Sequence, residues 1–180
     1  ARHLPTDEII KLVQKWVQAD KASQFLKILD NPSSTLTEVR EALRRFHQLV
    51  PGGVGLPEST LKSVRVAMTQ RILTEQIDFI QAAKDEVTVE FFHGIMDRVV
   101  TGPESHGKLG GKTSGLFLAE RILSRLASDQ ESVGNIKVPR SWYVASEEIM
   151  TFIEYNDLEE VLQQKYREIQ QVRHEYPNIV

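Results

Sequence analysis

The residues of this chain whose types and spacing could do chemistry are a group of glycines and a lysine near residue 110. They stand in the stretch SHGKLGGKTSGLFLAERIL, in which Gly110, Gly111 and Lys112 precede an apolar, helix-like segment. A phosphate-binding P-loop needs the pattern G-x-x-x-x-G-K-[ST], because a fixed length of backbone must wrap the phosphates. Counting back from Lys112 puts the first glycine at residue 106, where the sequence has His106. The stretch is therefore not a P-loop.

The residues themselves leave two interpretations open. Glycines let the backbone approach a ligand and adopt positive φ, and the amides of a following helix point at whatever lies before its first turn. Lys112 would add a mobile positive charge at a place already suited to an anion such as phosphate. The alternative is that the glycines only turn the chain and that Lys112 is a solvated surface residue. Spacing alone does not separate the two.

A longer pattern connects this loop to the segment that follows it. LGGKTSGLFLAERIL and then VPRSWYVASEEIMTFI together resemble the start of the nucleotide-binding domain of the phosphoenolpyruvate synthase and pyruvate phosphate dikinase family. That family opens with G-G-K-x-x-x-L, a helix and a V-P-x-G-F-x-V strand. The resemblance covers about residues 108–153 and does not reach residues 1–100. The matching residues are Gly110, Gly111 and Lys112 in the first element, Leu116 or its neighbour at the apolar helix position, and Val138, Pro139 and Val144 in the second element.

The resemblance implies an ATP-grasp fold, in which Lys112 contacts the phosphates of ATP while Gly110 and Gly111 shape the loop. The family transfers a phosphoryl group from ATP to a histidine and then to pyruvate, which requires Mg²⁺ and positive charge around the phosphate. Its remaining nucleotide-binding, phosphohistidine and pyruvate-binding parts would lie beyond Val180. We therefore expect a fragment of a phosphotransferase that binds ATP, works with the rest of the same polypeptide and is not catalytic alone.

The elements around the loop are expected from apolar periodicity and from start and stop signals. Helices are expected over about 6–29, 35–50, 57–80 and 91–100, the first capped by Thr6 and the second by a capping box of Thr35 and Glu38. The glycine loop, a helix, a short strand at IKVPRSWYVAS, a further turn of helix and a charged helix over about 156–174 follow.

These elements predict a mainly α chain, in which an N-terminal helical bundle precedes a partial α+β ATP-grasp-like segment. We place the domain boundary near residue 101, which gives a helical bundle over 1–100 and the opening part of a nucleotide-binding domain over 101–180.

Composition narrows the class of protein. The net charge of −3 over 180 residues gives no broad attraction for nucleic acid or anionic lipid, and the five histidines show no metal-binding spacing. No apolar run approaches the roughly 20 residues that span a bilayer, and the chain has no cysteine. We expect a cytoplasmic protein without nucleic-acid or membrane partners.

A second hypothesis belongs to a different class. The helices of residues 1–100 could bury their apolar faces against a partner or a second copy, so that the chain is a helical interaction or dimerisation module. The glycine loop would then be a linker without a nucleotide site.

Overall fold

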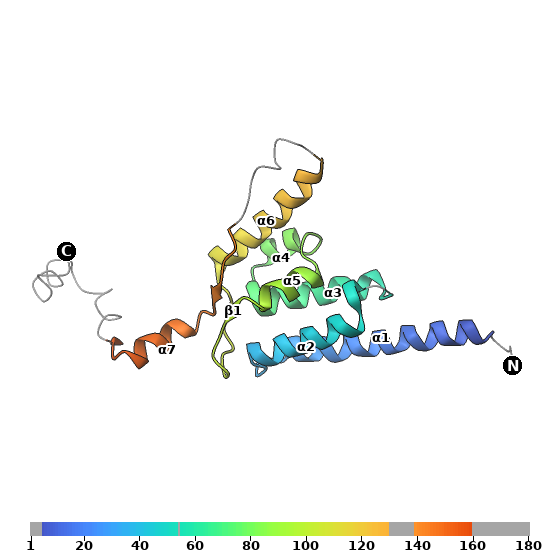
Figure 1. Cartoon of the computed structure of the whole chain (residues 1–180), viewed down its shortest axis with the longest axis horizontal. Coiled ribbons are helices and arrows are strands. Elements are labelled where there is room, and N and C mark those ends of the chain that lie inside the picture. Colours follow the sequence, from blue (N-terminus) through green and yellow to red (C-terminus); the bar gives the residue numbers. More distant parts are fainter. Residues whose placement is uncertain (1–4, 54, 130–138, 160–180) are drawn as a thin grey trace, which may run out of the picture. The chain divides into compact units, whose positions relative to one another are not determined.

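The structure, a computed structural model, describes residues 5–53, 55–129 and 139–159. It is built mainly of helices, as expected (Figure 1). The chain divides into two compact units, Ala1–Ser146 and Glu147–Val180. Residue 101 lies inside the first unit, and buried side chains from both sides of it belong to one hydrophobic core.

The first two helices are α1, Thr6–Asp30, and α2, Leu36–Leu49. The predicted capping box of α2 is confirmed: the amide of Glu38 donates to Thr35 Oγ1, and the amide of Thr35 donates to Glu38 Oε2. The prediction that Thr6 caps α1 is wrong. Pro5, with φ −57° and ψ 146°, is the N-cap residue and Thr6 is already helical, so no side chain caps this end.

A short 3₁₀ turn, η1, Pro51–Gly53, leads into the region expected as one helix over 57–80, which the structure divides into three elements. α3, Glu58–Met68, widens into a π-helical turn, η2, Thr69–Leu73, and α4 follows as Ile77–Ala83. The helix stops because Thr74 is extended, with φ −159° and ψ 154°.

The helix expected over 91–100 is shorter than predicted. α5 spans Val89–Met96, and Val99–Val100 form strand β1 instead. After the loop comes α6, Gly111–Asp129, and then strand β2, Tyr143–Val144, which pairs with β1 in parallel. The register places Val99 beside Tyr143 and Val100 beside Val144. The order β1, α6, β2 is thus a small β-α-β unit.

The core of the first unit joins this β-α-β unit to the helices before it. Phe25 of α1 stacks on Phe46 of α2, with ring centroids 4.9 Å apart. Phe117 of α6 contacts Phe91 of α5 and Tyr143 of β2, at centroid distances of 5.5 and 4.6 Å. Aromatic contacts therefore fix α6 both to the helical part and to the strand.

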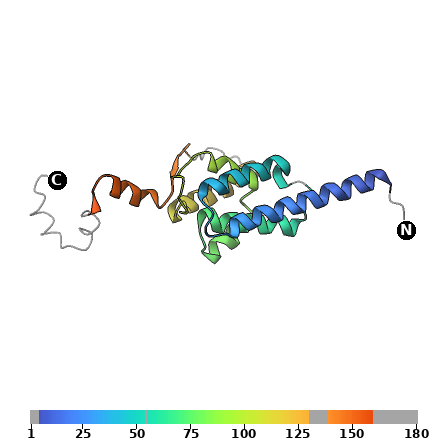
Figure 2. The ribbon, with the colours of Figure 1, turned by 90° about the horizontal axis from the view of Figure 1, so that it is seen from below.

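Figure 2 shows α1 beside the other helices, with its N-terminal half extending past them.

The second unit contains α7, Glu148–Tyr155, on which Ile153 is buried. The charged helix expected over 156–174 falls mostly on residues outside the described part of the chain. Among the helices of the described residues, none has the length and apolar character needed to cross a membrane.

Candidate functional site

The glycine-rich loop lies where the β-α-β unit passes from strand to helix. It leaves the carboxyl end of β1 at Val100 and enters α6 at Gly111. In parallel β-α-β units this strand-to-helix connection is the usual place for phosphate, because helix amides converge on it. The predicted site residues therefore lie in a suitable part of the fold.

The three predicted residues have different environments. Gly110 has a φ of +78°, a left-handed conformation that favours glycine. Gly111 is the first residue of α6, and Lys112 follows in its first turn with an exposed side chain. Ser114 closes that turn, since both its amide and its hydroxyl donate to the Gly110 carbonyl, at 3.0 and 2.8 Å.

The loop before Gly110 is held by the helical part through its backbone. The amide of Leu36 at the start of α2 donates to the Ser105 carbonyl at 2.8 Å, and the amide of Leu109 donates to the Ile72 carbonyl at 2.9 Å. His106 Nε2 lies 3.1 Å from the Ser33 carbonyl oxygen.

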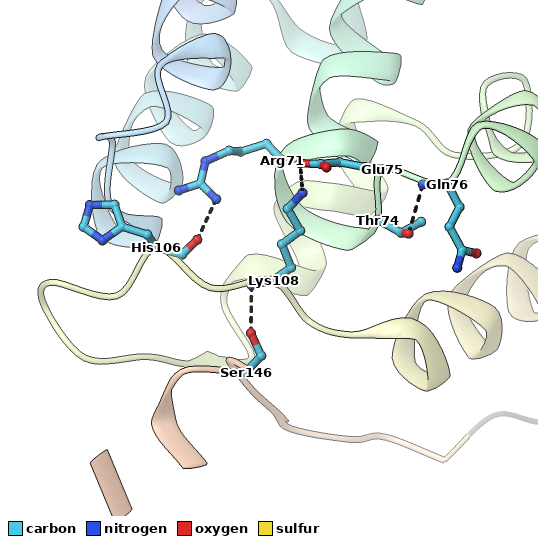
Figure 3. A network of polar contacts seen from close by, with 7 residues as sticks. All are labelled: Arg71, Thr74, Glu75, Gln76, His106, Lys108 and Ser146. Carbon is cyan, nitrogen blue, oxygen red and sulfur yellow. Dashed lines mark hydrogen bonds and ion pairs between the residues drawn. The ribbon is translucent and has the colours of Figure 1, made fainter. Parts of the chain in front are cut away.

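The end of β2 holds the same loop from the other side. The amide of Lys108 donates to Ser146 Oγ at 3.2 Å, and the amide of Ser146 donates to the Lys108 carbonyl at 3.0 Å (Figure 3). Segments from three parts of the sequence thus fix the approach to Gly110.

Arg71 is a buried member of this network that the sequence analysis missed. It belongs to the π-helical turn η2, and only 8% of its surface is exposed. Its guanidinium donates to the carbonyls of Ser34, at 2.5 Å, and of His106, at 3.0 Å. One sequence signal could have indicated Arg71: it is a charged residue between the apolar Met68 and Ile72, on a segment expected to be a packed helix.

Lys108 is the second residue that was missed. Its ammonium forms an ion pair with Glu75 at 2.5 Å, and this hydrogen bond and the positive charge lower the pKa of the Glu75 carboxyl (Figure 3). Both side chains line a pocket of about 390 Å³. The other lining residues are Leu29, Asp30, Pro32, Ala67, Gln70, Arg71 and His106.

The pocket is lined by Lys108 and not by Lys112, although both flank the double glycine. The Lys108 ammonium and the Glu75 carboxylate neutralise one another, so this pair acts as a tether of the loop. Lys112 has no such ion pair among the described residues. The two lysines therefore have different environments: Lys108 is paired with Glu75, and Lys112 is exposed in the first turn of α6.

The described residues include no group of three or more histidine, aspartate or glutamate side chains placed to hold a metal ion. The expected Mg²⁺ therefore stays a prediction tied to the nucleotide. Comparisons with protein-family models, curated proteins and solved structures give no match to this chain. The resemblance to the dikinase family accordingly rests on the sequence pattern alone.

Proposed function

We propose that this chain contributes the glycine-rich loop and the lysine of an ATP site to an ATP-dependent phosphotransferase that resembles the pyruvate dikinases. Gly110 and Gly111 would let the backbone approach the phosphates, and the Lys112 ammonium would offset their charge. Catalysis would require the rest of the ATP-grasp domain, with Mg²⁺ and the phosphate acceptor, as the resemblance implies.

The observation that carries the proposal is the position of the loop in the β-α-β unit. The loop ends in the left-handed Gly110, and the 19-residue helix α6 starts at Gly111. The first amides of any α-helix lack intrahelical acceptors, and the positive end of the helix dipole lies beside them. An exposed lysine in that turn makes the same place more favourable for an anion.

The glycines provide a second argument. A Cβ atom built at Gly111 or Gly115 would meet no atom within 4 Å, so packing within the described chain does not require glycine at either position. Glycine costs a helix about 1 kcal/mol relative to alanine. Close approach of a ligand outside the described atoms would explain why alanine is not used there.

The helical part also has a role in this proposal. The backbone contacts of Leu36 and Ile72, together with the Arg71 guanidinium, hold the loop that leads to Gly110. Residues 1–100 would then position the phosphate-binding loop. Weakening these contacts should alter the loop even though they lie away from Lys112.

The proposal can be tested by ¹H–¹⁵N NMR titration of the whole chain with Mg-ATP. Adenosine with Mg²⁺ is the control, because it has the base and ribose but no phosphate. We expect ATP to shift the amide signals of Gly110, Gly111 and Lys112, and Lys112→Ala to weaken this binding about tenfold, as loss of one charge-assisted contact predicts. Lys27→Ala changes an exposed lysine on α1 and should leave the titration unchanged. Absence of loop shifts, or equal affinity of wild type and Lys112→Ala, would exclude the proposed site.

A further inference from the structure

The N-terminal half of α1 exposes a continuous apolar surface, which we call the α1 stripe. Its largest member, Trp16, is 67% exposed, and the other members are between 38% and 49% exposed. In both ribbon views this half of α1 extends past α2 and α3 (Figures 1 and 2). The α1 stripe consists of Ile9, Ile10, Leu12, Val13, Trp16 and Val17.

The α1 stripe lies on the opposite side of the helix from the face that packs in the core. At about 100° per residue, its six side chains occupy an arc of about 160°. The buried residues Ala22, Phe25 and Leu29 lie about 170° away from the centre of that arc on the same helical projection. Gln18 is on the core side and lies against Gly55. The apolar pattern thus changes sides near residue 18.

Because the apolar side chains change sides, the α1 stripe does not continue the hydrophobic face that packs in the core. The helices that contact α1 most extensively among the described residues are α2 and α3, and the buried face of α1 carries Ala22, Phe25 and Leu29. A surface on the other side of α1 is open to a molecule approaching from outside the unit. Contiguous exposed apolar surface of this kind marks interaction sites.

We propose that the α1 stripe binds the α1 stripe of a second copy of this chain in an antiparallel pair centred on Val13. A two-fold pair of this kind places Ile9 opposite Val17 and Ile10 opposite Trp16, while Val13 meets its own copy. The interface is self-complementary, as two-fold symmetry requires. The bundle of each copy packs on the far side of its α1 and leaves the stripe accessible.

The charges beside the α1 stripe select the antiparallel direction. On the helical projection Glu8 and Lys15 flank one edge, and Asp7 and Lys21 flank the other. In an antiparallel pair like edges face each other, so each acidic residue near one end approaches a lysine of the second copy. A parallel pair would instead place Glu8 beside Asp7 of the other copy, which like-charge repulsion disfavours.

The first test compares two tryptophans of equal exposure by sedimentation of the whole chain over a concentration series. Trp16 is 67% exposed and Trp142 is 66% exposed. We expect a reversible dimer, Trp16→Glu to weaken it at least about tenfold as loss of a central aromatic anchor does, and Trp142→Glu to leave it unchanged. A wild-type monomer throughout, or a dimer that survives Trp16→Glu, would overturn the proposal.

The second test determines the direction of pairing. Since the chain has no cysteine, single cysteines can report on proximity. Val13→Cys should form a disulfide-linked dimer on mild oxidation. Ile9→Cys alone should not, but a mixture of Ile9→Cys and Val17→Cys chains should give the mixed dimer. Efficient self-linking of Ile9→Cys, without a mixed dimer of Ile9→Cys and Val17→Cys chains, would contradict the antiparallel pair.

The third test exchanges charges at one edge of the stripe. Glu8→Lys and Lys15→Glu should each weaken the dimer at low salt, because each creates like-charge contacts across the pair. The double variant restores opposite charges and should recover the wild-type affinity. Equal affinities of all four proteins would remove the electrostatic basis of the proposal. None of these tests depends on ATP binding.

Discussion

The ammonium of Lys108 lies 2.5 Å from a carboxylate oxygen of Glu75. This ion pair joins the loop before Gly110 to the residue that follows the extended Thr74 at the end of η2. The hydrogen bond and the charge of Lys108 lower the pKa of Glu75 from its ordinary value. The ion pair can therefore be tested by measuring the pKa of the Glu75 carboxyl.

Replacing Lys108 by methionine should raise the pKa of Glu75 towards its ordinary value of 4.5. In the wild type, a carboxyl with a lowered pKa in the folded state stabilises the fold at pH values above its unfolded pKa, and this contribution disappears as the pH falls through the folded pKa. The difference in the free energy of unfolding between the wild type and Lys108→Met should therefore shrink as the pH falls through the pKa of Glu75 in the folded wild type. NMR titration of the Glu75 side chain measures the pKa directly, with Lys112→Met as a control that leaves it unchanged.

Arg71→Met should destabilise the protein by about 2–4 kcal/mol, because the carbonyls of Ser34, which is buried, and of His106 would each lose a charged donor. Arg45→Met alters an exposed arginine and should change stability by less than about 0.5 kcal/mol. Urea unfolding of the three proteins measures both effects. If Arg71→Met unfolds like Arg45→Met, the guanidinium contacts with Ser34 and His106 contribute nothing to stability.

The two threonines expected as helix caps should behave differently. Thr35→Ala removes the confirmed capping box of α2 and should cost about 1 kcal/mol. Thr6 lies inside the first turn of α1 and makes no capping bond, so Thr6→Ala should stay within about 0.5 kcal/mol of the wild type. Thermal or urea unfolding of both variants provides the measurement. A larger loss for Thr6→Ala than for Thr35→Ala would reverse the assignment.

Local signals predicted the ranges of α1 and α2 well, because the causes of these helices lie within a few residues. The capping box of Thr35 and Glu38 is such a case. Strand β1 was missed because Val99 and Val100 continue the apolar pattern of α5, and their partners Tyr143 and Val144 are 44 positions later in the chain. A two-residue strand leaves no periodicity of its own.

The candidate site was predictable only in part for a similar reason. The double glycine is a local signal, and Gly110 has a positive φ of the kind that glycine permits, whereas Gly111 begins α6. The tether from Lys108 to Glu75 connects residues 33 positions apart, and the contact of Arg71 with His106 connects residues 35 apart. A single sequence does not reveal such distant pairs. The contacts of Lys108 and Arg71 that hold the loop could therefore be found only from the structure.

Alanine variants of Gly110 in the loop and Gly115 in α6 should change the stability of the fold in opposite directions. Gly110→Ala places a Cβ at a φ of +78° and should destabilise the protein by about 1–2 kcal/mol. Gly115 is a helical residue with open space around it, so Gly115→Ala should stabilise the protein by about 1 kcal/mol.

The same pair of variants then tests why glycine stands at residue 115. If a nucleotide approaches the helix closely, Gly115→Ala should weaken Mg-ATP binding while it raises the midpoint of urea unfolding. Parallel unfolding and NMR titration of one protein sample give both quantities. A variant that is more stable and binds ATP as the wild type does would show that residue 115 does not touch the ligand, and the glycine argument would then depend on Gly111 alone.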